Sequence, residues 1–138
     1  MSMEENKAMV RRVVEDVIHK GNLAAADEIL AADYVYHFPG NEIRGPEGFK
    51  QFATMMRAAL PDVNIQIETM VAEGDMVACR FLVRGTQQGE FMGIPPTGKK
   101  VEIKEAVFIK FAGGKEVEAW PYMDTLSIYQ QLGASPPN

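Results

Sequence analysis

One acidic residue interrupts the apolar face of a predicted strand in the segment VEIKEAVFIKF, which spans residues 101–111. The odd positions of this segment are apolar except for Glu105, whereas charged residues such as Lys104 occupy even positions. Such alternation is typical of a β-strand with one apolar face. A carboxylate on that face is costly unless it is paired, protonated or directed into a cavity. Burial in a cavity raises the pKa of a carboxyl, which suits a group that takes a proton next to a carbonyl.

We therefore expect Glu105 to be the base of a proton-transfer reaction. The alternative is a structural ion pair with Arg80 or Arg84 on the neighbouring strand, and both arrangements would direct the carboxylate toward a cavity. Arg80 is itself a candidate contact for the substrate as well as a structural partner.

A base of this kind needs a nearby donor for the oxygen that becomes negative. Tyr36 and His37 are candidates because they lie together on the β-prone segment 34–38. His37 could act as an acid or base near neutral pH, or it could be a loop histidine bonded to the backbone. Asp124 is a third catalytic candidate, although an aspartate at the start of a helix is also a good N-cap.

Four large side chains could form the wall of a site for a flat ligand, namely Phe91, Met92, Trp120 and Tyr122. Ordinary core packing is the alternative for all four. No cluster of His, Cys and Asp has the spacing of a metal site, and the PPTG loop at 95–98 lacks the spacing of a phosphate-binding loop. We therefore expect a small organic ligand, no metal and no cofactor.

The elements that must position these residues are helices followed by strands. Apolar residues recur with helical spacing in 4–20, 23–30, 46–60 and 124–132. Strands are predicted at 63–68, 76–87, 101–111 and 115–120, with a short β-prone piece at 34–38. This order predicts an α+β fold. We expect a cone-shaped barrel, in which the N-terminal helices pack on the concave side of a twisted mixed or antiparallel sheet around a pocket.

The composition indicates one soluble domain, which we place at 1–133 with a loose tail at 134–138. Its net charge of −5 argues against nucleic acid as a partner. Cys79 is the single cysteine, so no intramolecular disulfide can form, and a cytoplasmic location fits. The N-terminal residues lack the apolar core of a signal peptide, and no run approaches the roughly 20 apolar residues of a membrane span.

Several segments resemble the SnoaL-like polyketide cyclases. They are Gly85-Thr86, the loop GEFMGIPPTGK at 89–99, Gly114-Lys115 before the last strand, and Asp124 placed seven residues before Gln131-Leu132-Gly133. The similarity covers nearly the whole chain. The family belongs to the nuclear-transport-factor-2-like superfamily, so the resemblance implies the same α+β cone and usually a homodimer or larger homo-oligomer.

The resemblance also implies an activity, because characterised members of the family close a ring by intramolecular aldol condensation without metal or cofactor. Their acid/base aspartate and a nearby histidine correspond to Pro121 and Ala119 in this chain, and a further pocket histidine corresponds to Val107. The leading expectation is a cofactor-free cyclase or isomerase acting on a small, mostly apolar molecule. The alternatives are a non-catalytic ligand-binding or accessory protein and a pure association domain.

Overall fold

The structure is a computed structural model, and it describes residues 2–137. The first helix, α1 (Met3–Arg12), is capped by Ser2. The Ser2 hydroxyl accepts a hydrogen bond from the Glu5 backbone, and the Glu5 carboxylate accepts one from the Ser2 backbone. The helix continues as a π-helical segment, η1 (Val13–His19). Its apolar stripe was predicted from the spacing within 4–20.

The remaining helices and strands follow the expected order, except that a further short strand follows the first strand and that the first strand is longer than predicted. They are α2 (Ala25–Ile29), β1 (Leu30–Phe38), β2 (Asn41–Arg44), α3 (Gly45–Ala59), β3 (Asn64–Glu73), β4 (Met76–Thr86), β5 (Lys100–Ala112), β6 (Lys115–Met123) and α4 (Thr125–Leu132). Within the described residues, no helix has the length and apolar character that crossing a membrane requires.

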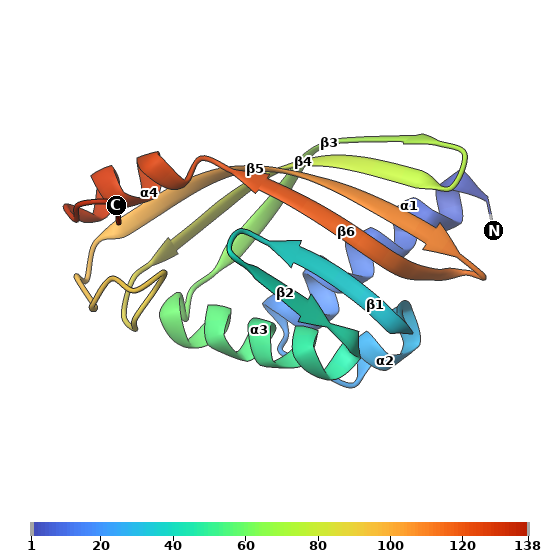
Figure 1. The fold of residues 1–138 in the computed structure, drawn as a ribbon, viewed down its shortest axis with the longest axis horizontal. Coiled ribbons are helices and arrows are strands. Elements are labelled where there is room, and N and C mark those ends of the chain that lie inside the picture. Colours follow the sequence, from blue (N-terminus) through green and yellow to red (C-terminus); the bar gives the residue numbers. More distant parts are fainter. Residues whose placement is uncertain (1, 138) are drawn as a thin grey trace.

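The strands form one mixed sheet in the order β2-β1-β6-β5-β4-β3. All neighbouring pairs are antiparallel except β1 and β6, which run parallel. Figure 1 shows the long strands curving over α1 and α3, while α4 lies at one end of the sheet. The predicted α+β cone with helices on its concave side is confirmed, although the sheet stays open and does not close into a barrel.

The segment around Pro39-Gly40 differs most from the prediction. The pair ends β1 at Phe38 as expected, but it also forms a two-residue turn, which was not predicted, in which Phe38 pairs with Asn41 and β2 folds back on β1. Gly40 supplies the turn because its φ of 78° is readily adopted only by glycine. Strand β1 also begins at Leu30, which shortens the preceding helix to Ala25–Ile29.

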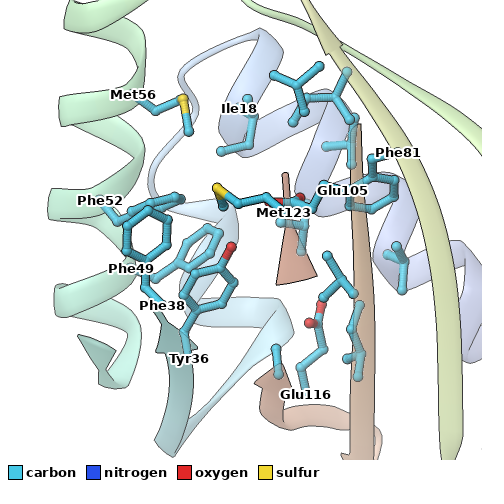
Figure 2. A pocket seen from close by; sticks show the side chains of 18 of the residues that line it. Ile18, Tyr36, Phe38, Phe49, Phe52, Met56, Phe81, Glu105, Glu116 and Met123 are labelled. Carbon is cyan, nitrogen blue, oxygen red and sulfur yellow. The ribbon is translucent and has the colours of Figure 1, made fainter. Parts of the chain in front are cut away.

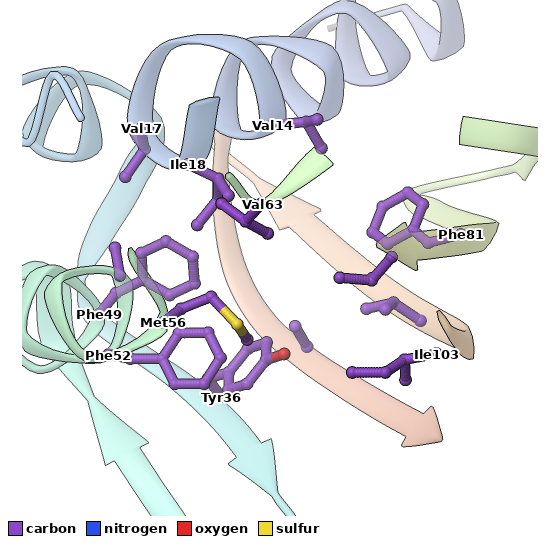
Figure 3. Packing of buried hydrophobic residues seen from close by; sticks show 14 of the residues in the cluster. Val14, Val17, Ile18, Tyr36, Phe49, Phe52, Met56, Val63, Phe81 and Ile103 are labelled. Carbon is purple, nitrogen blue, oxygen red and sulfur yellow. The ribbon is translucent and has the colours of Figure 1, made fainter. Parts of the chain in front are cut away.

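The core lies between the helices and the concave face of the sheet. Figure 3 shows Phe49, Phe52 and Met56 of α3 facing this space together with Ile18, while Ile103 faces it from the sheet. Pro46 near the first position of α3 and the periodic apolar residues of this helix were both visible in the sequence. Burial of these large side chains stabilises the fold by roughly 1.5–3 kcal/mol each.

A β-bulge near the start of β6 changes which face its residues occupy. Lys110 of β5 pairs with Glu118, whereas the next residue, Phe111, pairs with Glu116. Val117 is therefore an extra residue opposite the β5 backbone. Because side chains alternate along a strand, the extra residue moves Glu116 to the same concave face as Ala119.

Candidate active site

A cavity lies inside the cone, between the sheet and the helical layer (Figure 2). Its volume of about 80 Å³ accommodates roughly five to eight waters or one bicyclic organic molecule. The lining residues are Val10, Val13, Val14, Ile18, Tyr34, Tyr36, Phe38, Phe49, Phe52, Met56, Ile65, Phe81, Val83, Phe91, Ile103, Glu105, Val107, Ile109, Glu116, Ala119 and Met123.

One wall of the cavity is aromatic. The Tyr36 ring centroid lies 5.2 Å from that of Phe52 and 5.8 Å from that of Phe49, and Tyr34 packs edge-on against Phe49 at 6.0 Å. Such contacts fix the rings in place. Phe91, one of the four predicted wall residues, is 2% exposed and also lines the cavity.

Glu105 lines the cavity from the middle of β5, in register with Phe81 of β4 and Met123 of β6. Its half-buried side chain makes no hydrogen bond or ion pair with the described residues. Burial raises the pKa of its carboxyl from the ordinary 4.5 to about 7. The carboxyl is therefore poised to exchange a proton near neutral pH.

The arginine partners considered for Glu105 bind elsewhere. The Arg80 guanidinium donates a hydrogen bond to the Thr69 hydroxyl at 3.1 Å on the outer side of the sheet. The Arg84 guanidinium lies 3.6 Å from the Glu102 carboxylate. Neither arginine lines the cavity, so the structure gives Glu105 no arginine counter-ion and gives Arg80 no contact with a ligand in that space.

Glu116 is a second carboxyl in the cavity, and sequence reasoning missed it. Its residue is 3% exposed, and its Oε2 atom has no hydrogen-bond partner among the described residues. Burial raises the pKa of this carboxyl from 4.5 to about 8. Regular alternation counted back from Ala119 would place Glu116 outside, and only the bulge at Val117 turns it inward.

Tyr36 is the hydroxyl-bearing candidate that the structure does bring to the cavity. It is 7% exposed, and Figure 2 shows its hydroxyl directed into the cavity. Burial, aided by the negative charges of Glu105 and Glu116, raises the pKa of Tyr36 well above 10. The phenol therefore stays protonated at neutral pH and can donate a hydrogen bond.

His37 lies away from the cavity, beside outward-facing residues of β6. Its Nε2 atom is 2.6 Å from Oε2 of Glu118, and its ring stacks on Trp120 with centroids 5.5 Å apart. Tyr122, another predicted wall residue, is 62% exposed and packs edge-on against Phe108. None of His37, Trp120 and Tyr122 lines the cavity.

Asp124 and Met92 have structural contacts outside the cavity. Oδ1 of Asp124 accepts a hydrogen bond from the Ser127 backbone at 3.1 Å, which makes Asp124 the N-cap of α4. The carbonyl of Met92 accepts a hydrogen bond from the Tyr129 hydroxyl at 3.2 Å. Among the residues that the structure describes, no group of His, Cys, Asp and Glu is arranged to hold a metal ion.

This geometry defines an α+β cone protein with a mostly apolar internal site. The site contains two tyrosines and two carboxyls that have no hydrogen-bond or ion-pair partner among the described residues. The family model for the SnoaL-like polyketide cyclases matches residues 8–132. The chain belongs to this family. The positions that correspond to the family's aspartate and histidines are buried here but hold the apolar residues Pro121, Ala119 and Val107.

Relatives of known name cover almost the full length. The aklanonic acid methyl ester cyclase AcmA of Streptomyces galilaeus is 29% identical over 95% of this chain and 92% of its own. The structure of IdmH from Streptomyces antibioticus, described as a candidate polyketide cyclase, is 30% identical with a TM-score of 0.79 over 94% of this chain and 99% of its own. The structure of AclR from Streptomyces galilaeus, described as a candidate hydroxylase, is 30% identical with a TM-score of 0.83 over 98% of this chain and 100% of its own.

Proposed function

We propose that this protein binds a small, mostly apolar molecule with a carbonyl group in the cavity and moves a proton on it without a cofactor. The observation that carries the proposal is the unpaired Glu105 carboxyl, whose pKa is raised to about 7 inside an aromatic cavity. Near neutral pH, such a carboxyl can both accept and return a proton.

The reaction begins when the Glu105 carboxylate takes a proton from the carbon next to the substrate carbonyl. The electrons of that C–H bond form a carbon–carbon double bond, and the carbonyl electron pair moves to oxygen. Tyr36 donates a hydrogen bond to this oxygen and stabilises its negative charge. In a ring closure, the enolate carbon attacks a second carbonyl of the same molecule, and the alkoxide that forms there takes the proton back from Glu105. In an isomerisation, the substrate carries a further double bond conjugated with the enolate, and Glu105 returns the proton to the far end of that double bond, which shifts its position.

Family membership supports this reaction type, because AcmA is named as a cyclase and covers nearly the whole chain. The second candidate function is a non-catalytic ligand-binding or accessory protein. It is favoured by the apolar residues Ala119 and Pro121 at the positions where the resemblance implies a histidine and the acid/base aspartate.

A bicyclic ketone such as tetralone separates the two functions without knowledge of the natural substrate. We expect the protein to bind tetralone in the cavity and to accelerate the exchange of its α-protons with deuterium in D₂O, followed by proton NMR. Glu105→Gln should abolish the acceleration and retain binding, because it preserves shape but removes the proton acceptor. His37→Gln, on the outer face, is the matched control and should leave the exchange rate unchanged. Binding without accelerated exchange would favour the non-catalytic function.

A further inference from the structure

Glu116 takes no part in the proposed proton transfer, and it lies at the other end of the cavity from Glu105. Glu105 is level with Met123 near the end of β6, whereas Glu116 is level with Phe111 of β5. These levels are six residues apart on β5, or about 20 Å between backbone positions. The carboxyls themselves lie closer together, because both side chains extend into the same cavity and the negative charge of each raises the pKa of Tyr36. Figure 2 shows the two carboxyls entering the cavity from these separate places. Glu116 is also the more deeply buried of the two.

One carboxyl oxygen of the buried Glu116 has no hydrogen-bond partner among the described residues. This atom is Oε2, and within residues 2–137 no lysine, arginine or histidine lines the cavity. The other titratable groups of the lining are Glu105, Tyr34 and Tyr36. A buried polar atom without a partner is costly, and the cost is relieved when a bound molecule supplies the missing hydrogen bond.

We propose that Glu116 forms a second polar subsite, which binds a hydroxyl or carbonyl oxygen at the far end of the ligand. This inference rests on the proposed function, which places the reacting carbonyl at the Glu105 end of the same molecule. The second subsite narrows the class of ligand that the cavity would bind. It is an elongated molecule of about two rings with one oxygen group near Glu105 and another near Glu116.

The chemistry of the subsite favours an uncharged ligand group over an ammonium. Burial in an apolar environment disfavours the carboxylate, and the pKa of Glu116 of about 8 keeps most of the group protonated at pH 7. A protonated carboxyl has one O–H donor and acceptor oxygens, so it can bind a hydroxyl or a carbonyl. An ammonium would require Glu116 to lose its proton first.

The test compares methyl naphthyl ketone with an analogue that carries a hydroxyl on the far ring. We expect the hydroxylated compound to bind the wild-type protein about five- to tenfold more tightly, the gain of roughly one hydrogen bond. Glu116→Leu should abolish this preference, and Glu116→Gln should retain part of it because an amide also hydrogen-bonds. His37→Gln, on the outer face, is the matched control and should keep the full preference. Circular dichroism and urea unfolding check that each variant is folded.

Several results would overturn the inference. One is a hydroxyl preference that survives in Glu116→Leu, and another is its absence in the wild-type protein. A third is tighter binding of an aminomethyl analogue that depends on Glu116, because that would assign the subsite to a cation. If the unsubstituted ketone binds and tetralone exchange is accelerated while the hydroxyl has no effect, the subsite is refuted and the proposed function stands. If neither ketone binds the wild-type protein, both are refuted.

Discussion

Burial raises the pKa values of Glu105 and Glu116, and among the described residues no basic side chain lines the cavity to offset this effect. In the unfolded chain each carboxyl loses its proton near the ordinary pKa of 4.5, whereas in the folded protein it keeps the proton to higher pH. The stabilising contribution of each is therefore full at low pH. It declines as pH rises, until about pH 7 for Glu105 and about pH 8 for Glu116.

We expect the free energy of unfolding to carry this pH dependence. Between pH 5 and pH 8 the contribution of one such carboxyl falls by up to about 1.4 kcal/mol per pH unit. Glu116→Leu removes one of the two groups, so its unfolding free energy should fall less steeply over this range and should exceed the wild-type value at pH 8. Urea unfolding at a series of pH values measures both. Equal slopes for the two proteins would show that Glu116 is not buried in its protonated form.

The proton exchange of tetralone should show the titration of Glu105. Because the carboxylate is the reactive form, we expect the rate constant to rise with an apparent pKa of about 7 and then to level off. The measurement is the exchange rate by NMR from pH 5 to pH 9, with ligand saturation checked at each pH. A midpoint near the ordinary value of 4.5 would mean that Glu105 is solvated, and a flat profile would assign the exchange to another group.

At the residue scale, the cavity-facing position of Glu105 could be predicted from the sequence because its strand alternates regularly over its whole length. Its role as base stays a prediction. The pairing of Tyr36 with His37 was less well founded, since consecutive residues of a strand point to opposite faces and both could not reach one cavity. Glu116 could not be predicted, because the bulge at Val117 depends on how β5 and β6 pair, and no residue type in the sequence marks it.

At the scale of elements, Asp124 has a defined effect on α4. We expect Asp124→Ala to lower the free energy of unfolding by about 1 kcal/mol, because it removes the hydrogen bond to the Ser127 backbone. Ketone affinity and the tetralone exchange rate should not change, because Asp124 does not line the cavity. Asp124→Asn is the control and should retain most of the stability. A loss of exchange activity without a loss of stability would instead make Asp124 a functional acid.

The helices and the long strands were predicted because their apolar residues repeat with periods that differ clearly between the two kinds of structure. Pro39-Gly40 was read only as an interruption, so the hairpin that it makes and the strand β2 were not predicted. The parallel pairing of β1 with β6 brings together residues far apart in the chain, such as Tyr36 and Ala119. No local sequence pattern marks such a pair. The cone was therefore predictable from the sequence. The contribution of Glu116 to the cavity was not, because it depends on how distant strands pair.

At the scale of the whole molecule, the outer face of the sheet carries exposed aromatic side chains. Phe108 is 46% exposed and Tyr122 62% exposed, and their rings lie 6.2 Å apart. The same face carries both signs of charge, including Arg84 paired with Glu102. A mixed apolar and charged surface of this kind can be complementary to itself across a two-fold axis.

We therefore expect this face to join two copies of the chain into a homodimer. Phe108→Glu should shift the protein toward the monomer in sedimentation experiments at micromolar concentration, because it places a charge in the apolar centre of the contact. Met55, which is 43% exposed on α3 away from this face, provides a control in Met55→Glu. A wild-type protein that sediments only as a monomer would refute the homodimer.

The parallel pairing of β1 with β6 has a consequence for how the chain folds. Strand β1 is made early, yet its partner residues Glu118 and Ala119 lie close to the C-terminal end. Contacts between distant segments form slowly, because a long stretch of chain must be ordered before they can be made. On the ribosome, β1 and α3 emerge well before β6, so the edge of β1 that pairs with β6 stays open until β6 has been made. Nascent chains halted before β6 should therefore be recognised by chaperones, and release of the last strand should end that recognition.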